Sequence, residues 1–210
     1  MSQNKTPLSS LRAVPKASEK IVKADRTRAD ILNAALAFIW SRPFHEMTVR
    51  SIMDSTEISR PAFYRYFNGI HELMEALLEM LVEEIVIVVK PWYEGVGDPV
   101  VLINETIDGL TQVCYRRGPF LRAISDAATT DKRFENDWRA FLVGFDDLGC
   151  ELVASDQEQG LIPEFEPRPV VVSLNRLNVS TVIEAFGQRP RRKPEPVRKA
   201  LSRIWISTLY

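Results

Sequence analysis

The chain is poor in the residues on which most catalytic and metal sites depend. Its 210 residues include two cysteines and two histidines. Cys114 and Cys150 lack metal-ligand spacing and form no disulfide framework, which favours a reduced compartment. No G-x-S-x-G, P-loop, H-E-x-x-H or glycine-rich dinucleotide fingerprint accompanies His45 or His71. We therefore expect no enzyme activity, no metal and no cofactor.

Long apolar runs are also missing. The longest candidate, residues 85–89, lies between Glu84 and Lys90, whereas a membrane-spanning helix needs roughly 18 apolar residues. The N-terminus has no apolar segment of the secretory kind. These absences predict a cytoplasmic protein that makes no contact with a membrane.

What the sequence does contain is an uneven distribution of charge. Hydrophobic residues make up 45% of the chain and charged residues 26%, a composition that can bury a core. Residues 1–70 hold 11 Lys and Arg against six Asp and Glu, whereas residues 71–210 hold 16 against 22. A basic N-terminal third followed by an acidic remainder indicates that the N-terminal region binds a polyanion, although such a charge difference also arises by chance.

Hydrophobic periodicity predicts an all-α fold of about nine helices, because no segment alternates convincingly with the period of a strand. Prolines and glycines punctuate the pattern, and we expect Pro91 to end one helix and Gly118-Pro119 to break another. The expected helices cover about residues 25–42, 48–55, 59–67, 70–90 and 99–117, a shorter helix from 119, then 131–159, 167–187 and 195–210.

The stretch ISRPAFYRYF, residues 58–67, is predicted to begin a helix and not to break one. If Ser59 is the N-cap, Pro61 falls in the first turn, where its missing N–H has no intrahelical partner to lose. A tight turn separates this helix from the preceding short helix, which Thr48 is expected to cap. Two short helices joined by a tight turn predict a helix-turn-helix.

The two faces of the second short helix differ in character. Phe63 and Phe67 are four residues apart and are expected to face the core. Arg60 and Tyr64 share the opposite face, which is basic and aromatic and would fit a major groove about 12 Å wide. A solvated helix surface has the same composition, so spacing alone leaves both interpretations open.

Residues 25–73 resemble the DNA-binding domain of the TetR family of transcriptional regulators. The resemblance rests on ILNAALAFI, MTVRSIMDSTEISRPAFYRYF and HELMEALL, and chiefly on the pattern Ser-x-x-x-Phe-Tyr-x-x-Phe. It implies a homodimer that binds double-stranded operator DNA, with a flexible basic arm (1–22), a helix-turn-helix domain (23–69) and an effector-binding and dimerisation domain (70–210). The DNA-contacting residues that it implies are Thr48, Arg50, Ser59, Arg60, Pro61, Ala62, Tyr64, Arg65 and Tyr66.

Two positions depart from that family's pattern. Glu57 stands in the turn where the family usually has glycine, which predicts either a strained turn or a different one. Ile70 stands where the family often has a phosphate-binding lysine at the start of the next helix. Lysines and arginines of the N-terminal arm are candidates to replace that contact.

The C-terminal stretches LNRLNVSTVIEAF and IWISTLY resemble the EthR branch of the same family, in which a long apolar tunnel binds drug-like and lipid-like molecules. Asn175 and Asn178 lie three residues apart among apolar residues, and a buried amide needs a partner. A ligand, a neighbouring side chain or a water would each serve. The ligand-binding residues that the resemblance implies are Ile103, Thr106, Leu110, Trp138, Leu142, Phe145, Asn175, Asn178 and Trp205; the identities at 103, 106 and 110 differ from the branch.

The sequence therefore predicts a ligand-responsive DNA-binding transcriptional regulator. By analogy with the family, it is expected to be a repressor that leaves a palindromic operator when a small apolar effector binds the C-terminal domain. The alternative is a helical small-molecule-binding protein with weakened or lost DNA binding. Glu57 and Ile70, the two departures from the family's DNA-binding pattern, are the observations that suggest it.

Overall fold

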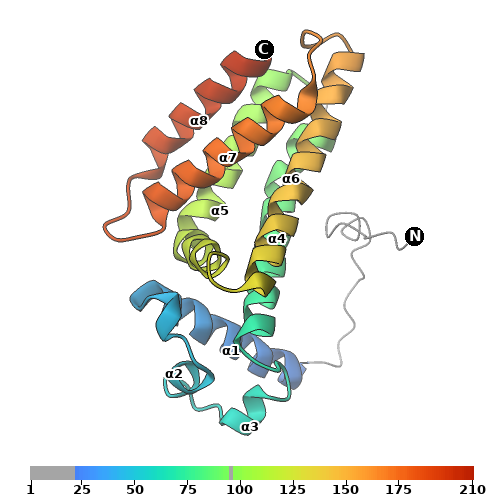
Figure 1. Ribbon diagram of the computed structural model, residues 1–210. Coiled ribbons are helices and arrows are strands. Elements are labelled where there is room, and N and C mark those ends of the chain that lie inside the picture. The colour runs from blue at the N-terminus through green and yellow to red at the C-terminus, as the bar shows by residue number, and fades with distance from the viewer. Residues whose placement is uncertain (1–21, 95–96) are drawn as a thin grey trace, which may run out of the picture. The chain divides into compact units, whose positions relative to one another are not determined.

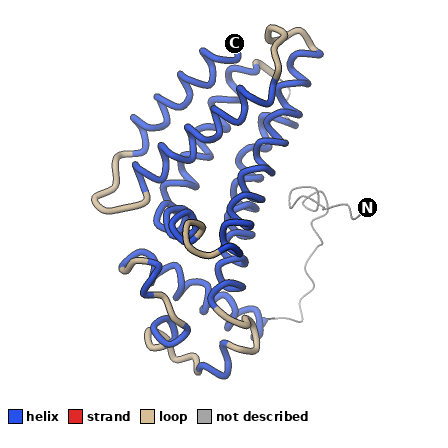
Figure 2. The backbone as a smooth tube through the Cα atoms, viewed as in Figure 1, coloured by secondary structure: helices blue, strands red, loops and turns tan. Residues whose placement is uncertain are grey.

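The computed structural model describes residues 22–94 and 97–210, with the backbone alone for residues 22–25. Throughout this part the fold is all-α, and no strand is present (Figures 1 and 2). No helix in these ranges is long and apolar enough to cross a membrane. The elements are α1 (Val22–Ser41), the 3-10 helix η2 (Phe44–Glu46), α2 (Val49–Met53), α3 (Arg60–Phe63), α4 (Ile70–Glu94), α5 (Pro99–Ala127), α6 (Lys132–Glu158), α7 (Pro167–Phe186) and α8 (Pro194–Leu209).

The chain forms two compact units. The first contains the residues up to Met80 together with Arg122–Trp138, and the second contains Leu81–Leu121 and Arg139–Tyr210. The domain boundaries expected from the sequence remain a prediction. The expected arm, residues 1–22, lies outside the described residues except for Val22.

The core of the first unit confirms the expected helical faces. Helix α1 contacts α2, and α2 contacts α3. Ile31 of α1, Ile52 of α2 and Phe63 of α3 are fully buried, and Phe67 is almost so. The rings of Phe63 and Phe67 lie 5.6 Å apart between centroids. Burial of these apolar side chains fixes which surface of α3 remains in water.

Helix α5 continues through Gly118-Pro119, so the described part has eight α-helices where about nine were expected. Pro119 cannot donate to the carbonyl of Tyr115 one turn earlier. That carbonyl instead accepts a 2.6 Å hydrogen bond from Nη1 of Arg191, in the loop between α7 and α8. A Cβ on Gly118 would lie 2.4 Å from the Phe186 carbonyl oxygen, so the glycine permits a close approach of α7. The dipeptide that looked like a helix break is therefore a packing site.

Helix α4 also continues past its proline, because Pro91 lies within the last turn and the helix ends at Glu94. This extra turn keeps Trp92 on the helix. The indole of Trp92 meets that of Trp205 on α8 edge to face, with 5.6 Å between the ring centroids. Helices α7 and α8 lie side by side in the second unit (Figure 1).

Candidate functional site

The two short helices of the first unit begin at the caps that the sequence predicts. Oγ1 of Thr48 accepts from the backbone N–H of Ser51 at 3.0 Å, and Oγ of Ser51 accepts from the N–H of Thr48 at 2.9 Å. Oγ of Ser59 accepts from the N–H of Ala62 at 3.3 Å, and Pro61 occupies the first turn of α3. These reciprocal bonds satisfy helix-end donors and fix where each helix starts.

The residues implied for DNA contact gather on the surface of this helix-turn-helix. Tyr64 is 56% exposed, although its ring edge also contacts Phe63. Neither Arg60 nor Arg65 has an ion-pair partner among the described residues, so both guanidinium groups remain available. The exposed members of the set are Thr48, Arg50, Ser59, Arg60, Pro61, Tyr64 and Arg65, and the half-buried ones are Ala62 and Tyr66.

The departures at Glu57 and Ile70 have different outcomes. No non-glycine residue in the described part has a positive φ, so Glu57 sits in an unstrained turn of a different type. At the start of α4, the Glu72 carboxylate accepts from the backbone N–H and the side-chain amide of Asn68, at 2.7 and 2.8 Å. A carboxylate at this end repels phosphate, so we expect no DNA contact at Ile70.

One cluster in the described residues has the composition of a metal site. Nε2 of His71 lies 2.8 Å from a carboxylate oxygen of Asp137, and Nδ1 lies 3.3 Å from one of Glu75. Burial raises the pKa of Glu75, and the neighbouring His71 opposes that rise. Each imidazole nitrogen thus faces a carboxylate, but Nε2 and the facing Asp137 oxygen are buried and make no hydrogen bond within the described residues.

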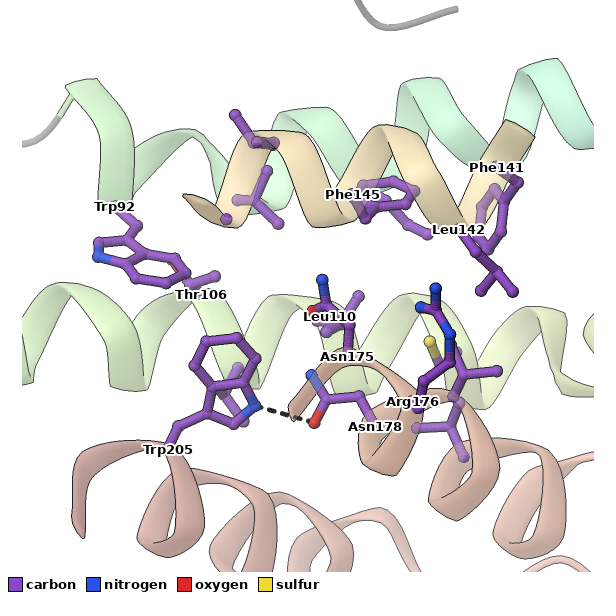
Figure 3. Close-up of a pocket in the computed structure, with 18 of the residues that line it drawn as sticks. Trp92, Thr106, Leu110, Phe141, Leu142, Phe145, Asn175, Arg176, Asn178 and Trp205 are labelled. Carbon is purple, nitrogen blue, oxygen red and sulfur yellow. Dashed lines mark hydrogen bonds between the residues drawn. The ribbon is translucent and has the colours of Figure 1, made fainter. Parts of the chain in front are cut away.

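The second unit contains a cavity of about 90 Å³. Its walls are largely apolar and come from α4, α5, α6, α7 and α8 (Figure 3). Seven residues of the predicted ligand-binding set line it: Thr106, Leu110, Leu142, Phe145, Asn175, Asn178 and Trp205. Ile103 is fully buried and Trp138 is half-buried, and neither is among the lining residues. That the seven bind a ligand remains a prediction.

One asparagine of the cavity wall is held by an aromatic neighbour. The indole N–H of Trp205 donates to Oδ1 of Asn178 at 3.0 Å (Figure 3). Asn178 is 6% exposed, and its Nδ2 has no hydrogen-bond partner among the described residues. An indole N–H can only donate, so the chemistry fixes the orientation of this amide.

The other asparagine is held by a buried carboxylate that is paired with a partly exposed arginine. Asp146 is 2% exposed and accepts from Nη1 and Nη2 of Arg176 at 3.1 and 2.6 Å. Its Oδ1 also accepts from Nδ2 of Asn175 at 3.0 Å. A buried carboxylate needs such charged partners, and the paired guanidinium supplies them.

Sequence reasoning missed thirteen of the 20 residues that line the cavity, most of them apolar, and also Asp146, which supports its wall. Trp92 was placed beyond the expected end of its helix at Pro91. Cys114 and Arg176 were not identified as lining residues, and Arg176 stands between the two asparagines. Asp146 carried a signal that was overlooked, because it lies four residues after Leu142 on the buried side of its helix.

Comparison with known proteins matches both parts of the chain. The family model "Bacterial regulatory proteins, tetR family" matches residues 31–77, and "Transcriptional regulator EthR, C-terminal domain" matches residues 103–210. The chain belongs to the TetR family of transcriptional regulators. It is a regulator of the TetR/EthR type with a helix-turn-helix DNA-binding domain, and the relatives it matches are regulators, not enzymes.

Individual relatives agree with this assignment. The chain is 25% identical to the HTH-type transcriptional regulator EthR of Mycolicibacterium smegmatis, over 100% of this chain and 94% of that protein. A TetR-family regulator structure from Syntrophomonas wolfei shares the fold at a TM-score of 0.77 and 14% identity, covering 89% of this chain and 96% of that one. FadR of Thermus thermophilus, solved with lauroyl-CoA, has a TM-score of 0.61 and 19% identity, covering 85% and 93%.

Proposed function

We propose that this TetR-family regulator is a homodimeric repressor that binds a palindromic operator. It dissociates from the operator when a small apolar effector binds its C-terminal domain. The observation that carries the proposal is the apolar cavity of about 90 Å³ in the same chain as the exposed helix-turn-helix. Arg60 and Arg65, which have no ion-pair partner among the described residues, are suited to phosphate or guanine edges. A two-fold protein reads two half-sites about one helical turn, or a multiple of it, apart.

The size of the cavity supports a role in switching. An apolar cavity of about 150 Å³ admits benzene, and pockets for drug-sized ligands measure about 300–1,000 Å³. A drug-sized effector therefore needs more room than this cavity offers, and movement of the surrounding helices would supply it. Because the expanded and contracted states differ in effector affinity, the effector shifts the population toward the expanded state. The lauroyl-CoA complex of the Thermus FadR is a precedent in the same fold for binding a molecule that carries an apolar chain.

The operator is tested by selecting sequences from a randomised duplex library at physiological salt. We expect enrichment of a palindromic consensus by the unmodified chain. Arg60→Ala should lose about 1–3 kcal/mol of discrimination at one base pair of each half-site. The matched control is Arg116→Ala, which removes an equally charged and largely exposed side chain from α5.

Bulk binding that depends on salt, with no enriched sequence, would instead support the alternative of a ligand-binding protein that has lost specific DNA recognition. Glu57 was one observation in favour of that alternative. It no longer supports it, because the turn at Glu57 has no positive φ and is therefore unstrained. Arg60 and Arg65 of the helix-turn-helix, which are exposed and lack ion-pair partners among the described residues, also argue against that alternative.

A further inference from the structure

Three side chains of the kinds that bind metal ions meet in the first unit, away from the cavity of the second. His71 and Glu75 lie four residues apart on α4, so both project from the same side of that helix. Asp137 reaches them from the second turn of α6. One ring nitrogen of His71 and one carboxylate oxygen from each acid lie within 4.8 Å of one another. All three residues belong to the same compact unit.

The contact between His71 and Asp137 lacks the geometry of a hydrogen bond. Nε2 of His71 lies 2.8 Å from Oδ2 of Asp137. Both atoms are buried, yet neither makes a hydrogen bond within the described residues, so the in-plane direction of the ring nitrogen misses the oxygen. Leaving a buried imidazole nitrogen and a buried carboxylate oxygen without such bonds is costly. A cation held by both atoms would satisfy them together.

The charges around the cluster favour a cation. Burial raises the pKa of Glu75; His71 opposes that rise, and the carboxylate of Asp137 adds to it. His71 supplies at most one positive charge against these two carboxylates. The neighbouring guanidinium of Arg133 donates instead to the carboxylate of Asp131, at 3.2 and 2.7 Å. A divalent ion would relieve the repulsion between the two acids.

We propose that His71, Glu75 and Asp137 bind a divalent first-row transition ion such as Zn²⁺. Imidazole nitrogen and carboxylate oxygen both bind Zn²⁺ at about 2.0–2.2 Å, which places the ligand atoms of a tetrahedral ion about 3.4 Å apart. A small movement therefore closes the cluster around the ion, and the Glu75 side chain, which is 43% exposed, is free to make it. Water completes the coordination. Mg²⁺ and Ca²⁺ fit less well, because they prefer oxygen ligands alone.

The site lies where it would brace the helix-turn-helix. The ring of His71 lies 4.9 Å from that of Phe134 on α6, between centroids. Phe134 in turn meets Phe44 of η2 edge to face at 5.4 Å, and η2 directly precedes α2. An ion shared by α4 and α6 would therefore stiffen the packing behind the two short helices. This role is independent of any effector in the cavity.

The test titrates Zn²⁺ into the full chain, stripped of metal beforehand, in competition with a chromophoric chelator at pH 7. We expect one tightly bound Zn²⁺ per chain. His71→Gln, Glu75→Gln and Asp137→Asn should each weaken binding at least about tenfold, because the loss of even an outer partner of a metal ligand costs about 10–100-fold. Mg²⁺ should bind at least about a hundredfold more weakly than Zn²⁺.

Two variants serve as matched controls. His45→Gln removes the other histidine of the chain, which is exposed in η2, and Glu79→Gln removes an exposed carboxylate one turn after Glu75. Both should keep the dissociation constant within about threefold, because an exposed charge interacts weakly with its neighbours. Thermal unfolding shows that each variant folds and gives a second readout. Zn²⁺ should raise the melting temperature of the unmodified chain and of the controls, but not that of the ligand variants.

The outcomes decide between a metal site and an ion-pair cluster. Zn²⁺ binding that all three ligand variants retain within about threefold would overturn the site, because the ion would then be held elsewhere. Failure of Zn²⁺ to bind would show that the cluster is an ion-pair network alone. Mg²⁺ binding as tight as that of Zn²⁺ would overturn the role of the imidazole. If one ligand variant does not fold, the other two decide.

Discussion

At the scale of single residues, the hydrogen bond between Trp205 and Asn178 should contribute to stability as well as to the cavity. Trp205→Phe retains an aromatic ring but removes the donor, which leaves Oδ1 of a buried amide unpaired. We expect the free energy of unfolding, measured in urea, to fall by about 1–3 kcal/mol. Adding Asn178→Leu removes the unpaired acceptor and should recover part of that loss. Strictly additive losses would show that the bond contributes little.

A second residue-scale prediction concerns the thiols. Burial raises the pKa of the Cys114 thiol to about 12, so that little of the reactive thiolate is present at pH 8. Burial also raises the pKa of Cys150, which is only half-buried. Iodoacetamide at pH 8 should therefore alkylate Cys150 in the native protein and Cys114 only after denaturation. Peptide mass spectrometry checks this, and rapid native labelling of Cys114 would contradict it.

Local chemistry decides which residues could be predicted from the sequence. The caps at Thr48 and Ser59 depend on residues within three positions, and both predictions are confirmed. Phe63 was placed in the core by its spacing, and it is fully buried. Asp146 and Arg176 are 30 positions apart, and nothing in the local pattern of either residue indicates the other. The ligand-binding set came from family resemblance, and its two outliers, Ile103 and Trp138, show that the resemblance does not fix the shape of the cavity.

At the scale of elements, Arg191 should contribute to stability because Pro119 leaves the Tyr115 carbonyl without its helical donor. Arg191→Met removes the donor to the Tyr115 carbonyl and the guanidinium that lies 4.0 Å from the Tyr115 ring centroid. We expect a loss of about 1–3 kcal/mol in unfolding free energy. In a Pro119→Ala background, residue 119 regains an N–H for that carbonyl, so the same substitution should cost less. Denaturation of the four proteins gives the coupling energy directly. Equal costs in both backgrounds would contradict the link.

Helix boundaries were predicted well wherever their determinants are local. Pro119 was misjudged because its compensation comes from a loop more than 70 residues later in the chain. Gly118 was expected to help break the helix, whereas its lack of a Cβ accommodates the backbone of Phe186. A proline or glycine inside a helical pattern therefore marks either an end or a close contact, and only the tertiary structure distinguishes the two.

At the scale of the whole molecule, the contracted cavity defines what an effector has to do. Even a small apolar molecule such as 1-octanol, with more heavy atoms than benzene, exceeds a space of about 90 Å³. Binding of such a molecule would therefore require more room within the unit formed by Leu81–Leu121 and Arg139–Tyr210. A ligand that widened this unit with no consequence for DNA would have no regulatory role, so the decisive quantity is the coupling between the two binding events.

That coupling has to be reciprocal. If a saturating apolar probe such as 1-octanol weakens binding of the selected duplex by a factor in the usual range of about 5–150, the saturating duplex must weaken binding of the probe by the same factor. Fluorescence anisotropy gives the first ratio, and ligand-observed NMR gives the second. Asn175→Ala should shift the probe concentration needed for release but leave duplex affinity unchanged without probe. If the probe binds but leaves duplex affinity unchanged, this cavity has no effector role. DNA recognition by the helix-turn-helix is tested separately by the duplex selection, so that result would not affect it.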